Sequence, residues 1–387
     1  MLTRISGRSS RRSAALLLAI GLSHLGCGGG PAPDRPEDAP AGPTALLPES
    51  DDVSGWARSS EPEVFDADTL YEYIDGQAGA TMYSNANTVP WPHAAEEFTD
   101  PWIADRIVDL VERADPAEPM ALMGMFWSPH PPLSCPEPYY SMYDGDSLSV
   151  PPTLGRWYDG QSPMHLINLP GHVSACFTVA DWRRSWAVYL GMVRLLDDCI
   201  GRVVEALKRR GFWDDALVIF TSDHGEMLGC HRMFQKMCMY EDAIRVPMLV
   251  KPPADAPAPP GARSQLTQHL DFAATICDYT GAADMPAGRG SSFRPVIEDA
   301  AAPGRPEVFV EFNGNSGRSF QQRAMVTATH KYIHNHQYQP ELYDLRTDPD
   351  ETENLCQAGS QPPEADHLRS RLRQWMLDTN DPITMPQ

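Results

Sequence analysis

Positive charge is scarce in this chain. Its 387 residues include 31 Lys and Arg against 52 Asp and Glu, a formal net charge of -21 at pH 7. This charge repels a phosphate backbone, and no local basic face offsets it, so the composition excludes a nucleic-acid partner. The hydrophobic share of 42% and the charged share of 21% are ordinary for a folded protein, so most of the chain is expected to fold.

Long apolar runs are lacking as well. The run at residues 14–22 is far shorter than the ~20 residues that span a membrane. Basic residues, this run and then small residues up to Cys27 form the layout of a secretory signal, so residues 1–27 are predicted to be a leader. Arg11 and Arg12 resemble a twin-arginine export signal. We therefore expect an exported protein, located in the periplasm or on the outer surface.

Two fates of this leader are open. Cys27 precedes three glycines and resembles the lipid-attachment cysteine of a bacterial lipoprotein, which predicts membrane attachment through a lipid. Simple cleavage is the alternative. The other seven cysteines show no CxxC or zinc-like spacing, so neither a zinc site nor a disulfide framework is predicted.

Two segments follow the leader. Residues 28–50 are rich in Pro, Gly, Ala and acidic residues, a composition typical of a disordered tether. Residues 51–95 include GWARSSEPEVFDADTLYEYIDGQAGATMY at 55–83, which resembles the opening of an uncharacterised family of secreted bacterial proteins. That resemblance implies no known chemistry, so 51–95 is predicted to be a segment of unknown role.

Helices and buried strands alternate over residues 96–302. Apolar residues recur with helical period over 100–113 and 186–207, and continuous apolar runs at 119–127 and 216–221 are typical of buried parallel strands. This alternation predicts an α/β fold, a mostly parallel sheet flanked by helices. A short strand at 246–250 and a helix at 265–279 complete the prediction for this domain.

The pattern changes in the last part of the chain, residues 303–387. Short apolar strands are predicted at 308–312, 324–329 and 331–335, before a turn-rich stretch and a helix at about 365–377. These elements predict a small α+β carboxyl-terminal subdomain.

Asp223 and His224 directly follow the predicted strand 216–221. Ligands of open α/β sheets bind at the carboxyl ends of the strands, and this pair supplies one oxygen and one nitrogen donor. Gly225 allows the backbone to turn tightly around a bound group. Taken alone, the pair is better explained as a helix-capping Asp and a surface His.

The wider sequence around this pair is more informative. The run TSDHGEMLGCHRMFQKMCMYEDAIRVPMLVKPP, residues 221–253, resembles the sulfatase branch of the alkaline-phosphatase-like superfamily almost position by position. Residues 323–335 and 341–355 resemble the carboxyl-terminal subdomain of the same family, so the resemblance covers about residues 96–377, the carboxyl-terminal two-thirds of the chain.

The resemblance implies roles for four residues, and position in the chain suggests a role for a fifth. Asp223 and His224 match ligands of a divalent cation, usually calcium. Lys236 matches the lysine that contacts the sulfate, and His130 in the stretch SPHPP matches the histidine that contacts the sulfate and helps to expel the leaving alcohol. His231 lies between the ligands and the lysine, where it could line the substrate pocket. Without the resemblance, Lys236 and His130 would be read as solvated surface residues.

Part of the family pattern is absent. Sulfatases cleave through a formylglycine made in a C/S-x-P/A-x-R motif, and no cysteine here has that sequence around it. The family also places an adjacent Asp pair after its first strand. The pairs at 51–52, 197–198 and 214–215 are rejected because none follows an apolar strand. Calcium takes six to eight oxygen ligands, so we expect a weakly held cation. The absence of the motif and of the Asp pair predicts that the amino-terminal part of the fold is missing.

Three functions follow from these observations. The first is a sulfatase-family protein acting on a sulfate-ester small molecule or a sulfated glycan, with impaired turnover because the nucleophile and the Asp pair are absent. The second is a non-catalytic exported binding module for sulfated or phosphorylated ligands. The third is a related phosphodiesterase or phosphonate hydrolase, which would share the Asp-His-Gly edge.

Overall fold

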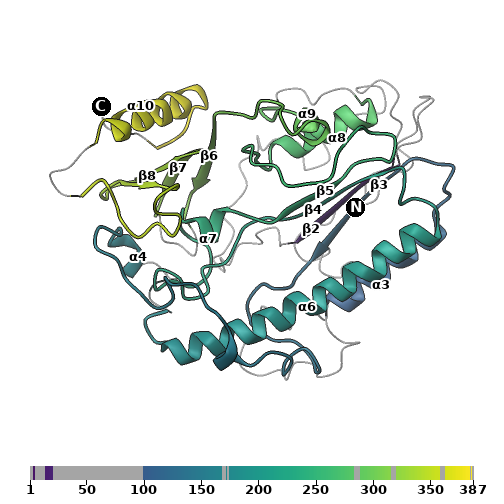
Figure 1. Cartoon of the computed structure of the whole chain (residues 1–387), viewed down its shortest axis with the longest axis horizontal. Coiled ribbons are helices and arrows are strands. Elements are labelled where there is room, and N and C mark those ends of the chain that lie inside the picture. The colour runs from purple at the N-terminus through teal and green to yellow at the C-terminus, as the bar shows by residue number, and fades with distance from the viewer. Residues whose placement is uncertain are drawn as a thin grey trace, which may run out of the picture.

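The computed structural model describes residues 3–4, 14–20, 99–167, 171, 174–282, 288–314, 320–357, 362–383 and 385. For residues 3–4 and 14–20 it describes the backbone alone. The predictions made for residues 28–50, for 51–95 and for Cys27 lie outside these ranges. Two sheets stand next to one another, a central one with the long helices and a smaller carboxyl-terminal one (Figure 1).

The central sheet has five strands in the order β1-β3-β2-β4-β5. Its strands are β1 (Thr3–Arg4), β2 (Ala14–Ile20), β3 (Met120–Phe126), β4 (Ala216–Ser222) and β5 (Met248–Lys251). The three inner strands are parallel to one another, while β1 and β5 pair antiparallel at the two edges. The predicted mostly parallel α/β sheet is therefore confirmed for its centre, and its edge strands run the other way.

Strand β2 comes from the run that the sequence predicts to be a leader. It pairs with β3 from Ala15 to Ile20 and with β4 from Ala14 to Ile20. Removal of residues 1–27 would therefore take the strand between β3 and β4 out of this sheet. The leader and the export that it implies stay predictions.

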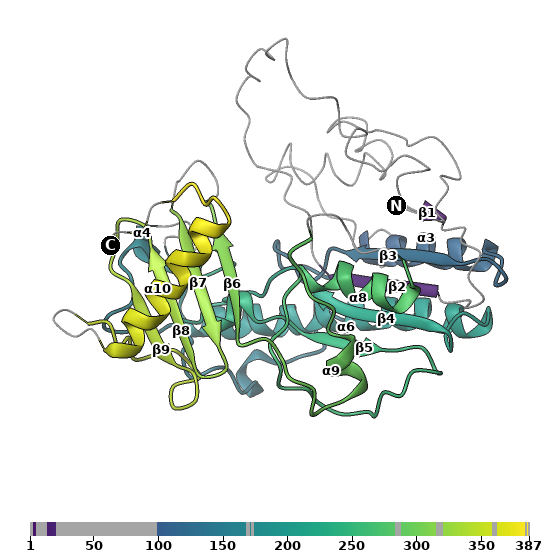
Figure 2. The same cartoon turned by 90° about the horizontal axis from the view of Figure 1, so that it is seen from above.

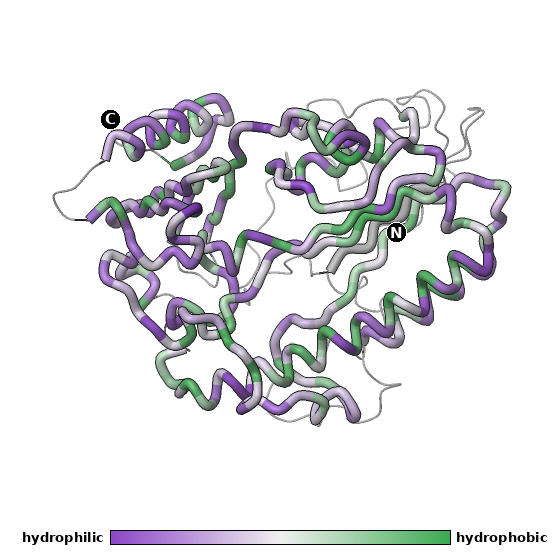
Figure 3. Tube along the Cα trace, viewed as in Figure 1, coloured by the Kyte–Doolittle hydropathy of each residue, from purple (hydrophilic) through white to green (hydrophobic). Residues whose placement is uncertain are grey.

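Helices cover both faces of the central sheet. The long helices α3 (Thr99–Arg113) and α6 (Val179–Arg209) lie together on one face, and α8 (Asp271–Thr280) and α9 (Arg294–Glu298) lie on the other (Figure 1). Side chains alternate between the faces: Val218 packs among residues of α3 and α6, whereas Leu217 and Ile219 pack beside Phe272 of α8. Apolar residues accordingly concentrate along these strands (Figure 3).

The smaller sheet is an antiparallel meander in the order β6-β7-β8-β9. Its strands are β6 (Glu307–Phe312), β7 (Gln322–Thr327), β8 (His330–Asn335) and β9 (Glu341–Asp344), and helix α10 (Pro363–Asp378) packs on one face (Figure 2). The opposite face packs against a loop of the α/β domain, residues 227–243. The strands at 308–335 and the last helix agree with the predicted α+β subdomain.

Short helices also lie in the connections that the structure describes. They are the 3-10 helix η3 (Gly145–Ser147), α4 (Met164–Ile167) and α7 (Glu241–Ile244). None of the helices within the described ranges combines the length and the apolar character needed to cross a bilayer.

Candidate functional site

The three inner strands of the central sheet end side by side. Ile20 of β2 is in register with Phe126 of β3 and with Ser222 of β4. The loop with His130 leaves β3 here, and Asp223 and His224 leave β4. Parallel strands thus place all three side chains at one edge, where open α/β sheets bind their ligands.

Local hydrogen bonds shape the Asp223–His224 turn. The Ser222 hydroxyl donates to the His224 carbonyl at 2.7 Å, and the His224 amide donates to Asp223 Oδ1 at 2.8 Å. Gly225 follows with its N–H on the Ala243 carbonyl at 2.7 Å, and a Cβ built on it would lie 2.0 Å from the Asp242 carbonyl oxygen. Only glycine therefore lets this turn approach the 240s segment so closely.

Asp223 and His224 face one another. Nε2 of His224 lies 3.4 Å from Oδ2 of Asp223, and its Nδ1 lies 2.9 Å from the Gly225 carbonyl oxygen. A carbonyl oxygen only accepts, so Nδ1 carries the proton and donates it, while Nε2 is the nitrogen turned toward the carboxylate. At this separation the two side chains can serve as neighbouring ligands of one cation.

His130 and Lys236 meet across 106 residues of chain. Nζ of Lys236 lies 2.8 Å from Nε2 of His130, and Nδ1 of His130 lies 2.6 Å from the Pro131 carbonyl oxygen. The same reasoning places the proton on Nδ1, so Nε2 accepts a hydrogen bond from the Lys236 ammonium. The ring of His130 lies 6.5 Å from that of His224, centroid to centroid, which joins the pair to the Asp223–His224 turn.

Burial changes the proton affinity of both partners. It lowers the pKa of His130 to about 4, with a further lowering from the neighbouring Lys236 charge. Burial also lowers the pKa of Lys236, while Glu226 and Asp223 oppose that effect. His130 is therefore neutral at pH 7, and Lys236 is a stronger acid than an ordinary lysine.

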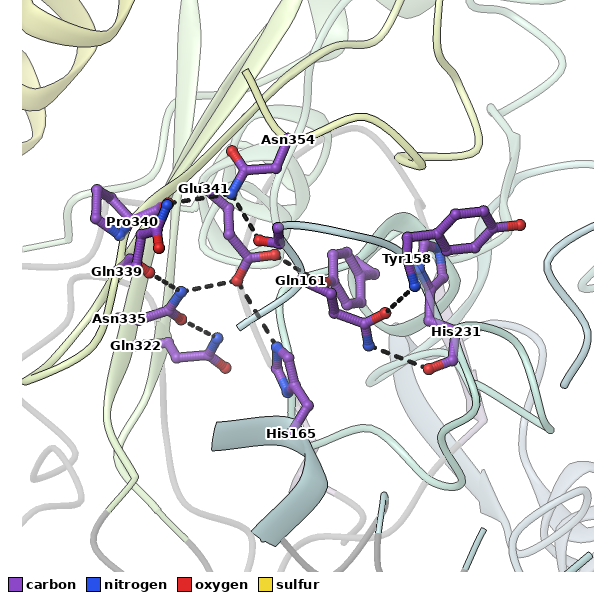
Figure 4. Close-up of polar contacts among 12 residues, drawn as sticks. Tyr158, Gln161, His165, His231, Gln322, Asn335, Gln339, Pro340, Glu341 and Asn354 are labelled. Carbon is purple, nitrogen blue, oxygen red and sulfur yellow. Dashed lines mark hydrogen bonds and ion pairs between the residues drawn. The ribbon is translucent and has the colours of Figure 1, made fainter. Parts of the chain in front are cut away.

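His231 lies elsewhere. Its ring stacks on Tyr240 with centroids 4.3 Å apart, its side chain is buried at 2% exposure, and Tyr158 and Gln161 lie beside it (Figure 4). Tyr240 in turn donates to Glu341 of the smaller sheet at 2.5 Å, so His231 lies next to the interface of the two domains. Gln161 donates to its carbonyl oxygen at 3.1 Å (Figure 4). No contact of His231 with His130, Lys236, Asp223 or His224 is present among the described residues, and its role in lining a substrate pocket stays a prediction.

A complete cation site is not assembled by the described residues. No group of three or more His, Cys, Asp or Glu side chains in those ranges is placed to hold a metal ion. Asp197 and Asp198 pair with Arg194 on the surface of α6, which agrees with their rejection as ligands. Asp223 and His224 are thus two donors of a site that, for calcium, needs six to eight, so these two residues alone do not complete a centre.

Among the residues that the structure describes, no thiol nucleophile lies at this edge either. Five of the seven cysteines in the described ranges are buried. Burial raises the pKa of Cys135 to about 11 and that of Cys230 to about 12, so both stay protonated at neutral pH. Cys176 is exposed, and it precedes α6 rather than ending a strand of the sheet.

Three residues next to the site were not predicted. Asp100 is buried and Glu226 is partly buried, and their carboxylates accept backbone N–H groups of the loops carrying His130 and Lys236. His269 places Nε2 2.9 Å from the Ser222 carbonyl oxygen and so donates to the end of β4. The sequence signal for Glu226 was its place in the DHGE run; Asp100 and His269 carry no signal that separates them from ordinary polar residues.

Comparison with known proteins places this geometry in a family. A sequence model described as Sulfatase matches residues 53–282, more than half of the chain, and so extends into the segment 51–95 that the sequence set apart. A second model, described as N-sulphoglucosamine sulphohydrolase, C-terminal, matches residues 229–378.

Individual proteins are similar as well. The chain is 27% identical over 287 residues to an arylsulfatase of Clostridium perfringens, covering 73% of this chain and 59% of that enzyme. The chain thus spans about three fifths of the length of this relative.

Two solved structures share the fold. One, a phosphonate monoester hydrolase of Agrobacterium radiobacter, has a TM-score of 0.67 at 21% identity and covers 95% of this chain and 78% of that one. The other, solved in complex with its substrate D-glucosamine-2-N,6-O-disulfate, has a TM-score of 0.64 at 20% identity, covering 73% and 70%.

Proposed function

The chain belongs to the sulfatase family, and we propose that its site binds the sulfate group of a sulfate ester, with sulfate-ester hydrolysis as the reaction of the class. The observation that carries the proposal is the Lys236 Nζ to His130 Nε2 distance of 2.8 Å at the carboxyl edge of the central sheet. Family membership supports this reaction class, and the pair supplies groups that can meet an oxyanion.

The pair suits a sulfate ester chemically. A lysine ammonium has three N–H donors, and His130 Nε2 occupies one of them, so the others are available to sulfate oxygens. A preorganised cation at this place stabilises negative charge as it develops on the sulfuryl group. Because the pKa of Lys236 is lowered, the pair also holds a proton that it can release to the oxygen of a departing alcohol.

Asp223 and His224 are proposed as two ligands of a divalent cation that helps to hold the sulfate. Carboxylate and imidazole suit such an ion, and a cation at this edge would offset the repulsion between the sulfate and the Asp223 carboxylate. With two donors the ion is held weakly. Without a formylglycine motif, turnover is expected to be slow or absent, and the chain to act as a binder.

Two measurements test this proposal. We expect saturable calorimetric binding of glucosamine 6-sulfate in calcium buffer, lost in Lys236→Ala and in His130→Ala and unchanged in Lys208→Ala, an exposed lysine at the end of α6. We expect 4-nitrophenyl sulfate to be hydrolysed at background rate. Absent binding by the unchanged chain, or binding that survives loss of Lys236, would refute the site; rapid hydrolysis would refute the impaired turnover.

A phosphonate or phosphate ester is the second candidate ligand. The observation in its favour is the fold shared with a phosphonate monoester hydrolase over 95% of this chain. The same titration with a phenylphosphonate monoester decides between them: tighter binding of the phosphonate than of the sulfate ester would favour this candidate.

Export stays part of the proposal. A leader at residues 1–27, cleaved or lipidated at Cys27, would place the chain in the periplasm or on the outer surface, where sulfated glycans are accessible. Fractionation of cells that express the whole chain, with residue-specific mass spectrometry of its amino terminus, tests this directly.

A further inference from the structure

The loops that carry His130 and Lys236 are not self-supporting. The Lys236 loop contains four non-glycine residues in the left-handed region: Leu228, His231, Arg232 and Gln235, with φ between 40° and 66°. Such backbone is costly and persists only where its surroundings hold it. The distance between Nζ and Nε2 therefore depends on groups that fix both loops.

Asp100 holds the loop of His130. It lies in the first turn of α3, is 3% exposed, and accepts the N–H of Trp127 at 2.6 Å and the N–H of Ser128 at 3.0 Å. The His130 N–H in turn donates to the Trp127 carbonyl at 3.0 Å. One carboxylate thus ties the start of a helix to the turn from which the histidine projects.

Glu226 holds the loop of Lys236 in the same way. Its Oε1 accepts the N–H of Leu228 at 3.2 Å and the N–H of Gln235, which directly precedes Lys236. The two N–H groups lie at the two ends of the left-handed stretch. This one oxygen therefore holds the two ends of the loop together.

We propose that Asp100 and Glu226 are positioning residues, a buried and a partly buried carboxylate that set the Lys236–His130 contact by accepting the backbone N–H groups of its two loops. Neither side chain contributes an atom to that contact. This inference rests on the proposed function only for the identity of the bound ligand. The positioning itself can be measured on the protein alone.

Isosteric substitutions separate this role from a merely stabilising one. Glu226→Gln keeps an oxygen that can accept both N–H groups, whereas Glu226→Leu removes it. Asp100→Asn keeps the acceptor for Trp127 and turns an NH2 group toward the Ser128 N–H, and Asp100→Leu removes both acceptors. Asp348→Leu is the control, because Asp348 also accepts two backbone N–H groups, those of Thr352 and Glu353, in a turn of the carboxyl-terminal subdomain.

The first readout needs no ligand. In the full chain labelled with 15N-histidine, the Nε2 signal of His130, assigned by its loss in His130→Gln, reports the hydrogen bond from Lys236. We expect it to shift to the value of a non-bonded neutral nitrogen in both leucine variants, to stay in Glu226→Gln and Asp348→Leu, and to lie between in Asp100→Asn. The affinity for glucosamine 6-sulfate should fall about tenfold to a hundredfold in the leucine variants and stay within about twofold in Glu226→Gln.

The outcomes are distinct. An unchanged His130 signal in both leucine variants, even with reduced stability, overturns the positioning role, and so does a signal lost equally in Glu226→Gln. If a leucine variant does not unfold cooperatively, Glu226→Asp replaces it: withdrawal of the carboxylate by about 1.5 Å should break the Gln235 contact and shift the signal, and an unshifted signal overturns the proposal. A responsive signal with no sulfate binding by any variant supports positioning and refutes the proposed function.

Discussion

Two regions of this molecule bury a lysine, and they do so in opposite ways. At the edge of the central sheet, Lys236 has a neutral imidazole as its nearest partner, and burial lowers its pKa. In the smaller sheet, Lys331 is fully buried in ion pairs of 2.7 Å with Glu241 and with Glu351. Burial alone would lower the pKa of Lys331, but Glu351 and Glu241 outweigh it and the pKa is raised.

The difference distinguishes a lysine in a binding site from a lysine in the interface between the two domains, which we call the seam. Lys331 joins β8 to α7 and to the turn after β9. Two carboxylates neutralise its charge, and these ion pairs hold the two domains together. The polar contacts of Glu341 with His165 and Asn335 continue that seam (Figure 4). Lys236 lacks a carboxylate in direct contact within the described residues, so its charge is available to an anion. A fully paired cation stabilises the fold, and an incompletely paired one can bind.

The two sheets differ in where their strands come from along the chain, and the first prediction tests this difference by removing one strand. The smaller sheet is a meander of neighbouring strands, whereas the central sheet depends on β2 from residues 14–20, which pairs with both β3 and β4. A chain that starts at residue 28 tests whether β2 belongs to the sheet of the mature protein or is removed with a cleaved leader. If β2 belongs to the sheet, this chain should lose cooperative unfolding of the α/β domain, followed by near-ultraviolet circular dichroism in urea, because two central strands lose their partner. Equal stability of both chains would show that β2 has no place in the mature sheet.

The second prediction compares the two lysines directly. Lys331→Met leaves two carboxylates facing each other in a buried seam and should lower the free energy of unfolding by about 3–5 kcal/mol. Lys236→Met, the matched variant, should change it by no more than about 1 kcal/mol, because its nearest partner is uncharged. Urea unfolding at pH 7.5 measures both. Equal losses would remove the distinction between seam and site.

The third prediction uses the histidine of the seam. Burial lowers the pKa of His231 to about 4, below the ordinary 6.5, so the unfolded chain binds more protons between these values. The resulting stabilisation is complete above pH 6.5 and is lost as the pH falls toward 4. His231→Asn, which tolerates the positive φ of this position, should reduce that loss by up to about 3 kcal/mol.

Urea midpoints from pH 8 to pH 4 measure this effect. Above pH 7 the difference between the two proteins should be constant, which is the internal control. Parallel curves down to pH 4 would contradict a buried, neutral His231.

Much of the fold could be predicted because its signals are local. Helical period gave α3 and α6, and apolar runs gave β3 and β4, each within a few residues of its observed bounds except the start of α6. The direction of β5 and the late start of α8 at Asp271 were not predictable, since pairing direction and helix entry depend on neighbours from other parts of the chain. The place of residues 14–20 shows the same limit, because an apolar run suits a leader and a buried strand equally.

The sequence by itself determined the family, the α/β class and the residue types that stand at the ends of the strands. His130, Asp223, His224 and Lys236 were all named from it. Only the tertiary structure decided that His130 and Lys236 touch, that His231 is buried in the seam, and that Asp100 and Glu226 hold the loops. The physical reason is distance along the chain: periodicity and turns are written in neighbouring residues, whereas a contact across 106 residues exists only once two strands and the second sheet have packed.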